Sequence, residues 1–259
     1  MSSGNDLIVK VIGGHGGVSP GYQATSYLIN GELLIDAGSI ASGLSIKEQL
    51  NVKNILISHA HLDHISELAY LCDNCFGLKT SPFLVYSNKM VKNAILDHIL
   101  NDTIWPDFSK LPSIEKPTIK FNEFLPGKTI ILDEYEITPI RVNHFTEACG
   151  FVITWREKTL IFTQDTGPTE EIWKIGNKEN LVGIFCEVSF PNTLDQVAID
   201  SLHHTPKSIG LELIKMPAKV PIYLGHLKPN YQDILVNEIA GLGESRIRLL
   251  IKDGVELKF

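Results

Sequence analysis

Short apolar runs separated by turn residues dominate the first quarter of the chain. Four such runs predict β-strands, at residues 7–12, 25–29, 32–36 and 54–58. The pair Asn30-Gly31 lies between the second and third runs, which is a strong hairpin pattern. The last run is continuously apolar and therefore predicts a buried strand, and residues 41–50 before it predict a short helix. The chain thus begins as strands joined by turns.

After residue 64 the apolar period changes to that of a helix, and from there helices and strands alternate. Helices are predicted after His64 and at 88–100, 206–215 and 231–242. Strands are predicted at 83–86, 129–132, 135–142, 150–156, 159–163, 183–187 and 220–224, with short strands closing the chain. Three prolines within 101–120 predict a long, partly ordered loop. This order of elements favours a layered α/β fold with mixed sheets.

Composition and charge narrow the class of protein. The chain has 259 residues and a net charge of −7, and no two Lys or Arg residues are adjacent. This argues against a nucleic-acid groove and against a polybasic membrane anchor. We see no apolar run of membrane-spanning length and no signal peptide. Four cysteines are too few for a disulfide scaffold of this size. We therefore expect a reduced, cytoplasmic enzyme that does not act at a membrane.

Six residues directly after the buried strand hold four side chains that can bind a metal: His59, His61, Asp63 and His64. An extended backbone points the first two to the same side, since they are two residues apart. Asp63 and His64 lie at the turn into the next helix. Imidazole and carboxylate are the ligands of hydrolytic zinc sites. Surface or helix-capping roles explain one or two of these residues but not all four.

This hexapeptide is the signature of the metallo-β-lactamase superfamily, which the chain resembles. The resemblance implies an αββα sandwich of two mixed β-sheets flanked by helices, formed by residues 1–259 as a single domain. It also implies two divalent metal ions, zinc first, with manganese or iron as alternatives. One ion takes His59, His61 and His144, and the other takes Asp63, His64 and His226. Asp165 bridges both ions.

The segments between the ligands resemble the class II 3′,5′-cyclic-nucleotide phosphodiesterases over nearly the whole chain. The matching stretches are residues 58–66, 104–108, 163–168, 187–192, 203–206 and 225–229. The resemblance departs from the family at Glu67 and His204, and we interpret His204 as structural. It implies hydrolysis of the 3′ phosphoester bond of cAMP or cGMP, giving the 5′-monophosphate. A hydroxide that bridges the two metals is the expected nucleophile.

Glu187 and His203 resemble the paired Glu and His of the tRNA 3′-processing endonucleases. There the glutamate orients a histidine that protonates the leaving oxygen. We expect His203 to be the general acid here, because a nearby carboxylate raises its pKa and keeps it protonated. Asp63 is expected among both the ligands and the catalytic residues. A surface or helix-capping role is the alternative for Glu187 and His203.

Three further side chains are candidates for contacts with a nucleotide. Lys228 could neutralise the phosphoryl group, while Trp105 and Phe145 could stack on a base. A surface position is the alternative for Lys228, and ordinary packing is the alternative for both aromatic residues. An RNA-processing nuclease and a metal-binding or ligand-sensing protein without turnover are the alternative functions. The oligomeric state is open, with a homodimer as the form common among relatives.

Overall fold

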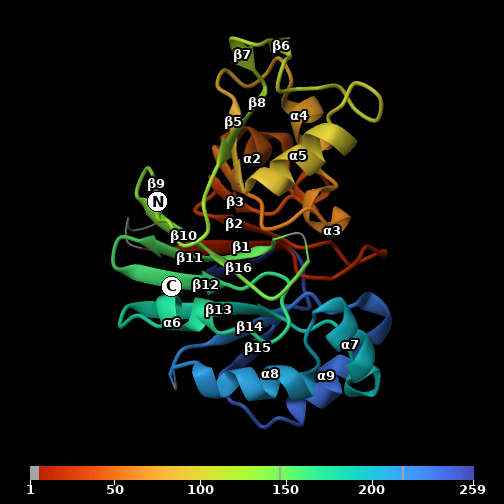
Figure 1. Ribbon diagram of the computed structural model, residues 1–259, viewed down its shortest axis with the longest axis vertical. Helices are drawn as coiled ribbons and strands as arrows, with labels where there is room; N and C mark the ends of the chain where they lie inside the picture. Colours follow the sequence, from red (N-terminus) through yellow and green to blue (C-terminus); the bar gives the residue numbers. More distant parts are fainter. Residues whose placement is uncertain (1–5, 146, 218) are drawn as a thin grey trace. The chain divides into compact units, whose positions relative to one another are not determined.

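The computed structural model describes residues 6–145, 147–217 and 219–259 (Figure 1). The chain divides into two compact units. Unit 1 comprises the chain up to Gly13, Gln23–Leu125 and Asp253–Lys258, and unit 2 comprises Gly14–Tyr22, Pro126–Lys252 and Phe259. Each unit contains a seven-stranded mixed sheet. The α/β class with two mixed sheets flanked by helices is therefore confirmed, whereas a single domain over residues 1–259 stays a prediction.

The sheet of unit 1 has an antiparallel half and a parallel half. In spatial order its strands are β16 (Val255–Lys258), β1 (Ile8–Gly13), β2 (Ser26–Ile29), β3 (Leu33–Ile35), β4 (Asn54–Leu56), β5 (Phe83–Ser87) and β8 (Ile119–Glu123). The first four strands pair antiparallel and the last four pair parallel. The apolar side chains of β4 are fully buried, as expected for a strand covered on both faces. In β5 burial alternates: Phe83 and Val85 are fully buried, whereas Leu84 and Tyr86 are partly exposed.

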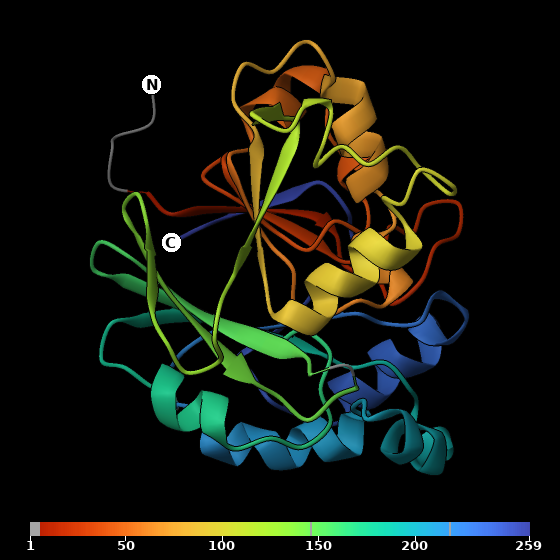
Figure 2. The same cartoon turned by 45° about the horizontal axis from the view of Figure 1, so that its top comes forward.

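The helices of unit 1 among its described residues are α1 (Ile40–Gly43), α2 (Ile46–Asn51), α3 (Leu62–Ile65), α4 (Leu68–Cys75) and α5 (Lys89–His98). Their apolar side chains join those of the strands in one core, and Figure 2 shows α4 and α5 in orange and yellow beside this sheet. The prediction of one helix at 41–50 was wrong. Ser45 forms a capping box with Glu48 and starts a new helix there, because its side chain satisfies an amide at the helix start.

Residues 101–120 are more regular than predicted. They contain a small hairpin formed by β6 (Pro112–Ser113) and β7 (Lys116–Pro117), and they lead into β8. Prolines are tolerated in the hairpin because it is only two strands wide and stands apart from the main sheet. From Ile119 onward, pairing with β5 continues through five residues. The partly ordered loop therefore ends earlier than the proline pattern indicated.

The sheet of unit 2 repeats the two-part plan. Its strands, in spatial order, are β15 (Ile247–Leu249), β14 (Ile222–Gly225), β13 (Leu181–Glu187), β12 (Lys158–Phe162), β11 (Cys149–Trp155), β10 (Tyr135–Arg141) and β9 (Ile130–Leu132). β12 to β15 pair parallel and β9 to β12 pair antiparallel. The strands predicted for this half of the chain are confirmed, with shifts of a few residues at their ends.

In the described part of unit 2, this sheet is accompanied by α6 (Glu171–Gly176), α7 (Asp195–Ser201), α8 (Pro206–Glu212) and α9 (Gln232–Ala240). Apolar residues of α6, α8 and α9 share a core with the strands (Figure 1). α6 and α7 were not predicted, because each is too short to show a clear apolar period. α8 ends before its predicted end, and residues 213–215 continue as a 3₁₀ turn. Among the described residues, no helix is both long and apolar enough to cross a lipid bilayer.

Candidate functional site

Unit 1 carries the four metal-capable residues of the hexapeptide. The chain leaves the parallel strand β4, and His61 is the N-cap of α3, which contains Asp63 and His64. The ring of His59 lies 4.6 Å from that of His61 and 4.2 Å from that of His64, centroid to centroid. His59 and His64 are fully buried. The structure therefore brings these side chains together as the spacing predicted.

Asp36 orients this group of histidines. Its Oδ2 lies 2.6 Å from Nδ1 of His64 and also accepts a hydrogen bond from Oγ of Ser58 at 2.8 Å. Its Oδ1 accepts one from the Ser58 backbone amide at 2.8 Å. Oγ of Ser58 lies 2.9 Å from Nδ1 of His59. Because Nδ1 is engaged in both histidines, Nε2 is the nitrogen with which each can bind a metal.

The backbone around Asp36 fixes the position of its carboxylate. Asp36 has a φ of +56°, a left-handed conformation that few non-glycine residues adopt. The amide of the next residue, Ala37, donates to the carbonyl of His64 at 2.7 Å. A Cβ on Gly38 would lie 2.0 Å from the carbonyl oxygen of Asp63, so only glycine allows this close approach. The loop is thus attached directly to helix α3.

Unit 2 carries the remaining predicted ligands at the ends of its strands. His144 follows β10, Asp165 follows the parallel strand β12, and His226 follows β14. Oδ2 of Asp165 lies 3.9 Å from Nε2 of His144, and its Oδ1 lies 3.3 Å from Nδ1 of His226. Nδ1 of His144 lies 3.1 Å from the carbonyl oxygen of Leu202, which leaves Nε2 directed toward the carboxylate. The aspartate therefore lies between two histidines.

His226 occupies a constrained position after β14. Its φ is +60°, and its amide donates to the carbonyl of Gly14 at 2.6 Å. A Cβ on Gly16 would lie 2.7 Å from the His226 ring. A side chain at Gly16 would therefore collide with His226, so the glycine at this position has a structural role.

Glu187 and His203 form a buried ion pair in unit 2. Oε1 of Glu187 lies 2.8 Å from Nδ1 of His203. Burial alone would raise the pKa of Glu187, but the charge of His203 and its hydrogen bond outweigh burial and lower it. Burial likewise opposes protonation of His203, yet the charge of Glu187 and the hydrogen bond to it raise the His203 pKa. Both shifts favour an imidazolium hydrogen-bonded to a carboxylate.

The ion pair lies beside the predicted ligands of unit 2. The His203 ring stacks on the His226 ring with centroids 5.6 Å apart, and lies 4.9 Å from the ring of His144. Ser189 links these groups, because its Oγ donates to Oε2 of Glu187 at 2.8 Å and lies 3.2 Å from Nδ1 of His203. The predicted general acid and the carboxylate that orients it are thus found together.

The three predicted substrate contacts have different surroundings. The Lys228 ammonium donates to the carbonyl of Gly16 at 2.7 Å and lies 6.0 Å from the centroid of Phe190. The Phe145 side chain is 47% exposed, and its ring lies 5.5 Å from that of His144. Trp105 packs against Tyr70 in unit 1, with centroids 5.3 Å apart. Substrate contact by these residues stays a prediction.

Sequence reasoning did not identify Asp36, Ser58 or Ser189. The apolar pattern predicts only that Asp36 ends a strand. The sequence does place this carboxylate directly after an apolar run. A carboxylate buried there needs hydrogen-bond partners, and that requirement was the signal that could have identified it. Ser189 lies two residues after Glu187, so it shares that residue's side of an extended chain, but serine in that position is too common to stand out.

The side chains of each unit suit divalent metal ions. In unit 1, ligand atoms of His59 and His61 lie within 4.8 Å of each other, as do those of Asp63 and His64. In unit 2 the same holds for Asp165 with His144 and with His226. Neutral imidazoles whose other nitrogen is hydrogen-bonded to a carboxylate, hydroxyl or carbonyl are well suited to zinc. The chain therefore has the donor set of a divalent metal site.

Comparisons with known proteins agree with this description. A protein of Yersinia pestis named "Probable 3′,5′-cyclic-nucleotide phosphodiesterase" is 26% identical over 280 aligned positions, covering 86% of this chain and 79% of the relative. The structure of unliganded yeast PDE1 has a TM-score of 0.78 at 16% identity, covering 98% of this chain and 99% of the other. The metallo-β-lactamase fold protein YhfI of Bacillus subtilis has a TM-score of 0.75 at 19% identity, covering 98% and 100%.

These structural neighbours confirm the metallo-β-lactamase fold predicted from the hexapeptide. A family model described as "Anti-Pycsar protein Apyc1" matches residues 11–236, which is most of the chain and includes every predicted ligand. The protein therefore belongs to the family of the anti-Pycsar protein Apyc1.

Proposed function

We propose that this protein is a metal-dependent phosphodiesterase that hydrolyses 3′,5′-cyclic nucleotides to nucleoside 5′-monophosphates. The observation that carries the proposal is the buried Glu187–His203 ion pair, whose imidazolium stacks beside His226 and lies next to His144. A histidine with a raised pKa next to the predicted metal ligands suits cleavage of a phosphoester whose alkoxide leaving group must be protonated. The names of the relatives from Yersinia pestis and Aliivibrio fischeri support the same reaction.

We propose that the chain holds two divalent ions, as the resemblance to the metallo-β-lactamase superfamily implies. His59, His61 and His144 would bind one ion, and Asp63, His64 and His226 the other. Asp165 would bridge them, since its two oxygens already lie toward different histidines. When bound, such ions supply Lewis acidity toward phosphoryl oxygens and lower the pKa of water toward neutrality. We propose zinc for both positions, because the donor set is imidazole and carboxylate.

His203 would act as the general acid. Its Nδ1 is held by Glu187 and Ser189, so the Nε2 proton is the one available for transfer. During hydrolysis the bond between phosphorus and the 3′ oxygen breaks and water supplies the new oxygen on phosphorus. The Nε2 proton moves to the departing 3′ oxygen, and a proton from water restores the imidazolium. Glu187 stays ionised and orients the ring.

Two residues of unit 2 are proposed to contact the nucleotide. Lys228 uses one donor on the carbonyl of Gly16, and its ammonium has two further donors for phosphoryl oxygens. Phe145 presents an exposed aromatic face beside His144 that can stack on a base. Trp105 would contribute stacking from unit 1. We also propose a homodimer in solution, which sedimentation equilibrium would measure.

The test is turnover by zinc-reconstituted protein of four substrates: 3′,5′-cAMP, 3′,5′-cGMP, bis(p-nitrophenyl) phosphate and a precursor tRNA. We expect hydrolysis of a cyclic nucleotide, with the 5′-monophosphate as the product resolved by chromatography. Elemental analysis of the same sample should give two zinc ions per chain. Cleavage of the precursor tRNA without hydrolysis of cyclic nucleotides would favour the RNA-processing alternative. Two bound ions without turnover of any substrate would favour a binding or sensing protein.

A further inference from the structure

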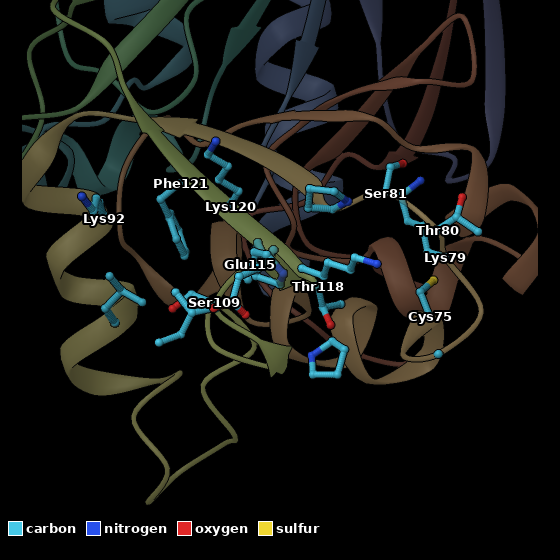
Figure 3. A pocket seen from close by; sticks show the side chains of 18 residues that line it. Cys75, Lys79, Thr80, Ser81, Lys92, Ser109, Glu115, Thr118, Lys120 and Phe121 are labelled. Carbon is cyan, nitrogen blue, oxygen red and sulfur yellow. The ribbon is translucent and has the colours of Figure 1, made fainter.

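Unit 1 contains a second feature that the proposed reaction does not use. A cavity of about 610 Å³ lies between the end of α4, the loop after it, helix α5, the β6–β7 hairpin and the start of β8. In Figure 3, Lys92 and Phe121 lie on one side of the cavity, and Lys79, Thr80 and Ser81 lie on the other. The structure describes all of the predicted metal ligands and catalytic residues, and none of them lines this cavity.

The charge of this cavity is opposite to that of the chain. Four lysines and one glutamate line it, namely Lys79, Lys92, Lys116, Lys120 and Glu115. The net charge of the lining is therefore +3, whereas that of the whole chain is −7. Ammonium groups repel one another when brought together, and a bound anion would relieve that repulsion. The cavity is therefore complementary to a negatively charged ligand.

The four lysines are not equally available to a ligand. The Lys79 ammonium donates to the carbonyl of Leu50 at 2.8 Å, so it belongs to the wall of the cavity. Lys92 forms an exposed ion pair with Glu123 at 3.0 Å, and such a pair opens at little cost. Within the described part of the chain, the ammonium groups of Lys116 and Lys120 form no ion pair or hydrogen bond. Lys92 and Lys116, from two different walls, can therefore turn toward an anion.

The rest of the lining is apolar or carries hydroxyl groups. Leu96 and Phe121 are half-buried against the core, and Ile114 at the tip of the β6–β7 hairpin is 75% exposed. Thr80 and Ser81 add hydroxyl groups on the opposite side. A simple inorganic anion would leave these apolar surfaces exposed to water. A ligand with an apolar ring as well as negative charge would cover them.

We propose that this cavity binds a small phosphorylated molecule of nucleotide size. Lys92 and Lys116 would neutralise the phosphates of this ligand, and the ring of the ligand would pack against Phe121. The volume lies within the range of small-molecule sites, about 300–1,000 Å³. A single strand of nucleic acid would instead need a basic groove several nucleotides long. The proposal does not depend on the reaction proposed above, because it uses other residues and requires no metal.

The test uses the full-length, zinc-loaded protein and three probes: ADP, adenosine and pyrophosphate. Isothermal titration calorimetry measures each affinity, and hydrogen exchange with mass spectrometry locates the ligand. We expect ADP to protect peptides spanning residues 109–121, and to bind at least tenfold more tightly than adenosine or pyrophosphate. In the double variant K92Q/K116Q, the Kd for ADP should rise on the order of tenfold, as for the loss of charge-assisted contacts to phosphate.

The matched control is the double variant K47Q/K89Q, which removes the same charge from exposed lysines of α2 and α5 that do not line the cavity. Its Kd for ADP should stay within about twofold of the wild-type value, because only long-range charge changes. Three results would overturn the proposal: protection confined to peptides outside residues 75–121, equal weakening in both double variants, or adenosine or pyrophosphate binding as tightly as ADP. Circular dichroism and thermal unfolding verify that both variants are folded.

Discussion

The substitution Asp36→Asn tests whether the ligands of unit 1 depend on a residue that does not itself bind the metal. Asp36 is fully buried and accepts three hydrogen bonds, two from Ser58 and one from His64. Asparagine has nearly the same shape but replaces one accepting oxygen with a donating NH₂ group. If that NH₂ group faces His64, Nδ1 of His64 must accept its hydrogen bond, and the ring proton of His64 must then lie on Nε2. Nε2 is the nitrogen needed for the metal, so binding is opposed.

The magnitude follows from the contacts that are lost. A hydrogen bond to a charged group contributes about 1.5–3 kcal/mol, and the bond between His64 and Asp36 is short at 2.6 Å. Substitution of residues that orient metal-binding histidines lowers metal affinity by about 10- to 100-fold. We expect a loss of that size. If the NH₂ group instead faces the Ser58 amide, two donors oppose each other, which lowers folding stability by about 1–3 kcal/mol.

The assay is competition for zinc against a chromophoric chelator, together with thermal unfolding of the metal-free and zinc-loaded protein. Asp73→Asn is the matched control, because this aspartate is exposed on α4 and carries the same charge. The control should bind zinc as the wild type does. A folded Asp36→Asn variant with both wild-type zinc affinity and wild-type stability would refute the argument that Asp36 sets the tautomer of His64.

Three further predictions concern the catalytic pair and a helix start. His203→Ala should lower turnover by about 100- to 10,000-fold while zinc content by elemental analysis stays unchanged, and normal turnover would remove His203 from the mechanism. Ser189→Ala should lower kcat by about tenfold with KM within about twofold, because Ser189 Oγ donates to Glu187; a change confined to KM would contradict this positioning role. The hydrogen bond from Lys10 lowers the pKa of Glu48 to about 2, below the unfolded value of 4.5. Glu48→Gln should therefore lower the free energy of unfolding by about 0.5–1 kcal/mol near pH 7. Chemical denaturation should show this difference disappearing as pH falls from 4.5 toward 2, because Glu48 then becomes protonated. A difference independent of pH would refute this reasoning.

The candidate metal ligands could be recognised in the sequence because their spacing is unusual. Three histidines and an aspartate within six residues are hard to explain by a structural role, and the later ligands each follow an apolar strand. Asp36 was not predictable in the same way. It lies 22 residues before Ser58 and 28 before His64, and nothing in the local pattern distinguishes it from an ordinary turn aspartate. Only pairing of β3 with β4 brings these segments together.

The errors in secondary structure have a similar cause. The periodicity of residues 41–50 is that of one helix, but the capping box of Ser45 divides it. Prolines near β8 suggested irregular structure, whereas pairing with β5 supplies the regularity from a distant part of the chain. Helix α7 is short and mostly exposed, so it leaves almost no apolar pattern. Local patterns therefore predicted elements with a clear apolar period, and missed a helix start set by capping, a short exposed helix and a strand close to prolines.

The pairing of β1 with β16 has a consequence for synthesis of the protein in cells. Ile8 pairs with Lys258 and Val11 with Val255, so the earlier strand has no partner on this side until all of unit 2 except Phe259 has been made. While the ribosome is translating the intervening residues, β1 has only β2 beside it, and its other side can pair with any extended chain nearby. The nascent polypeptide is therefore most prone to aggregate before residues 255–258 emerge, and this outer position is where a chaperone would protect it.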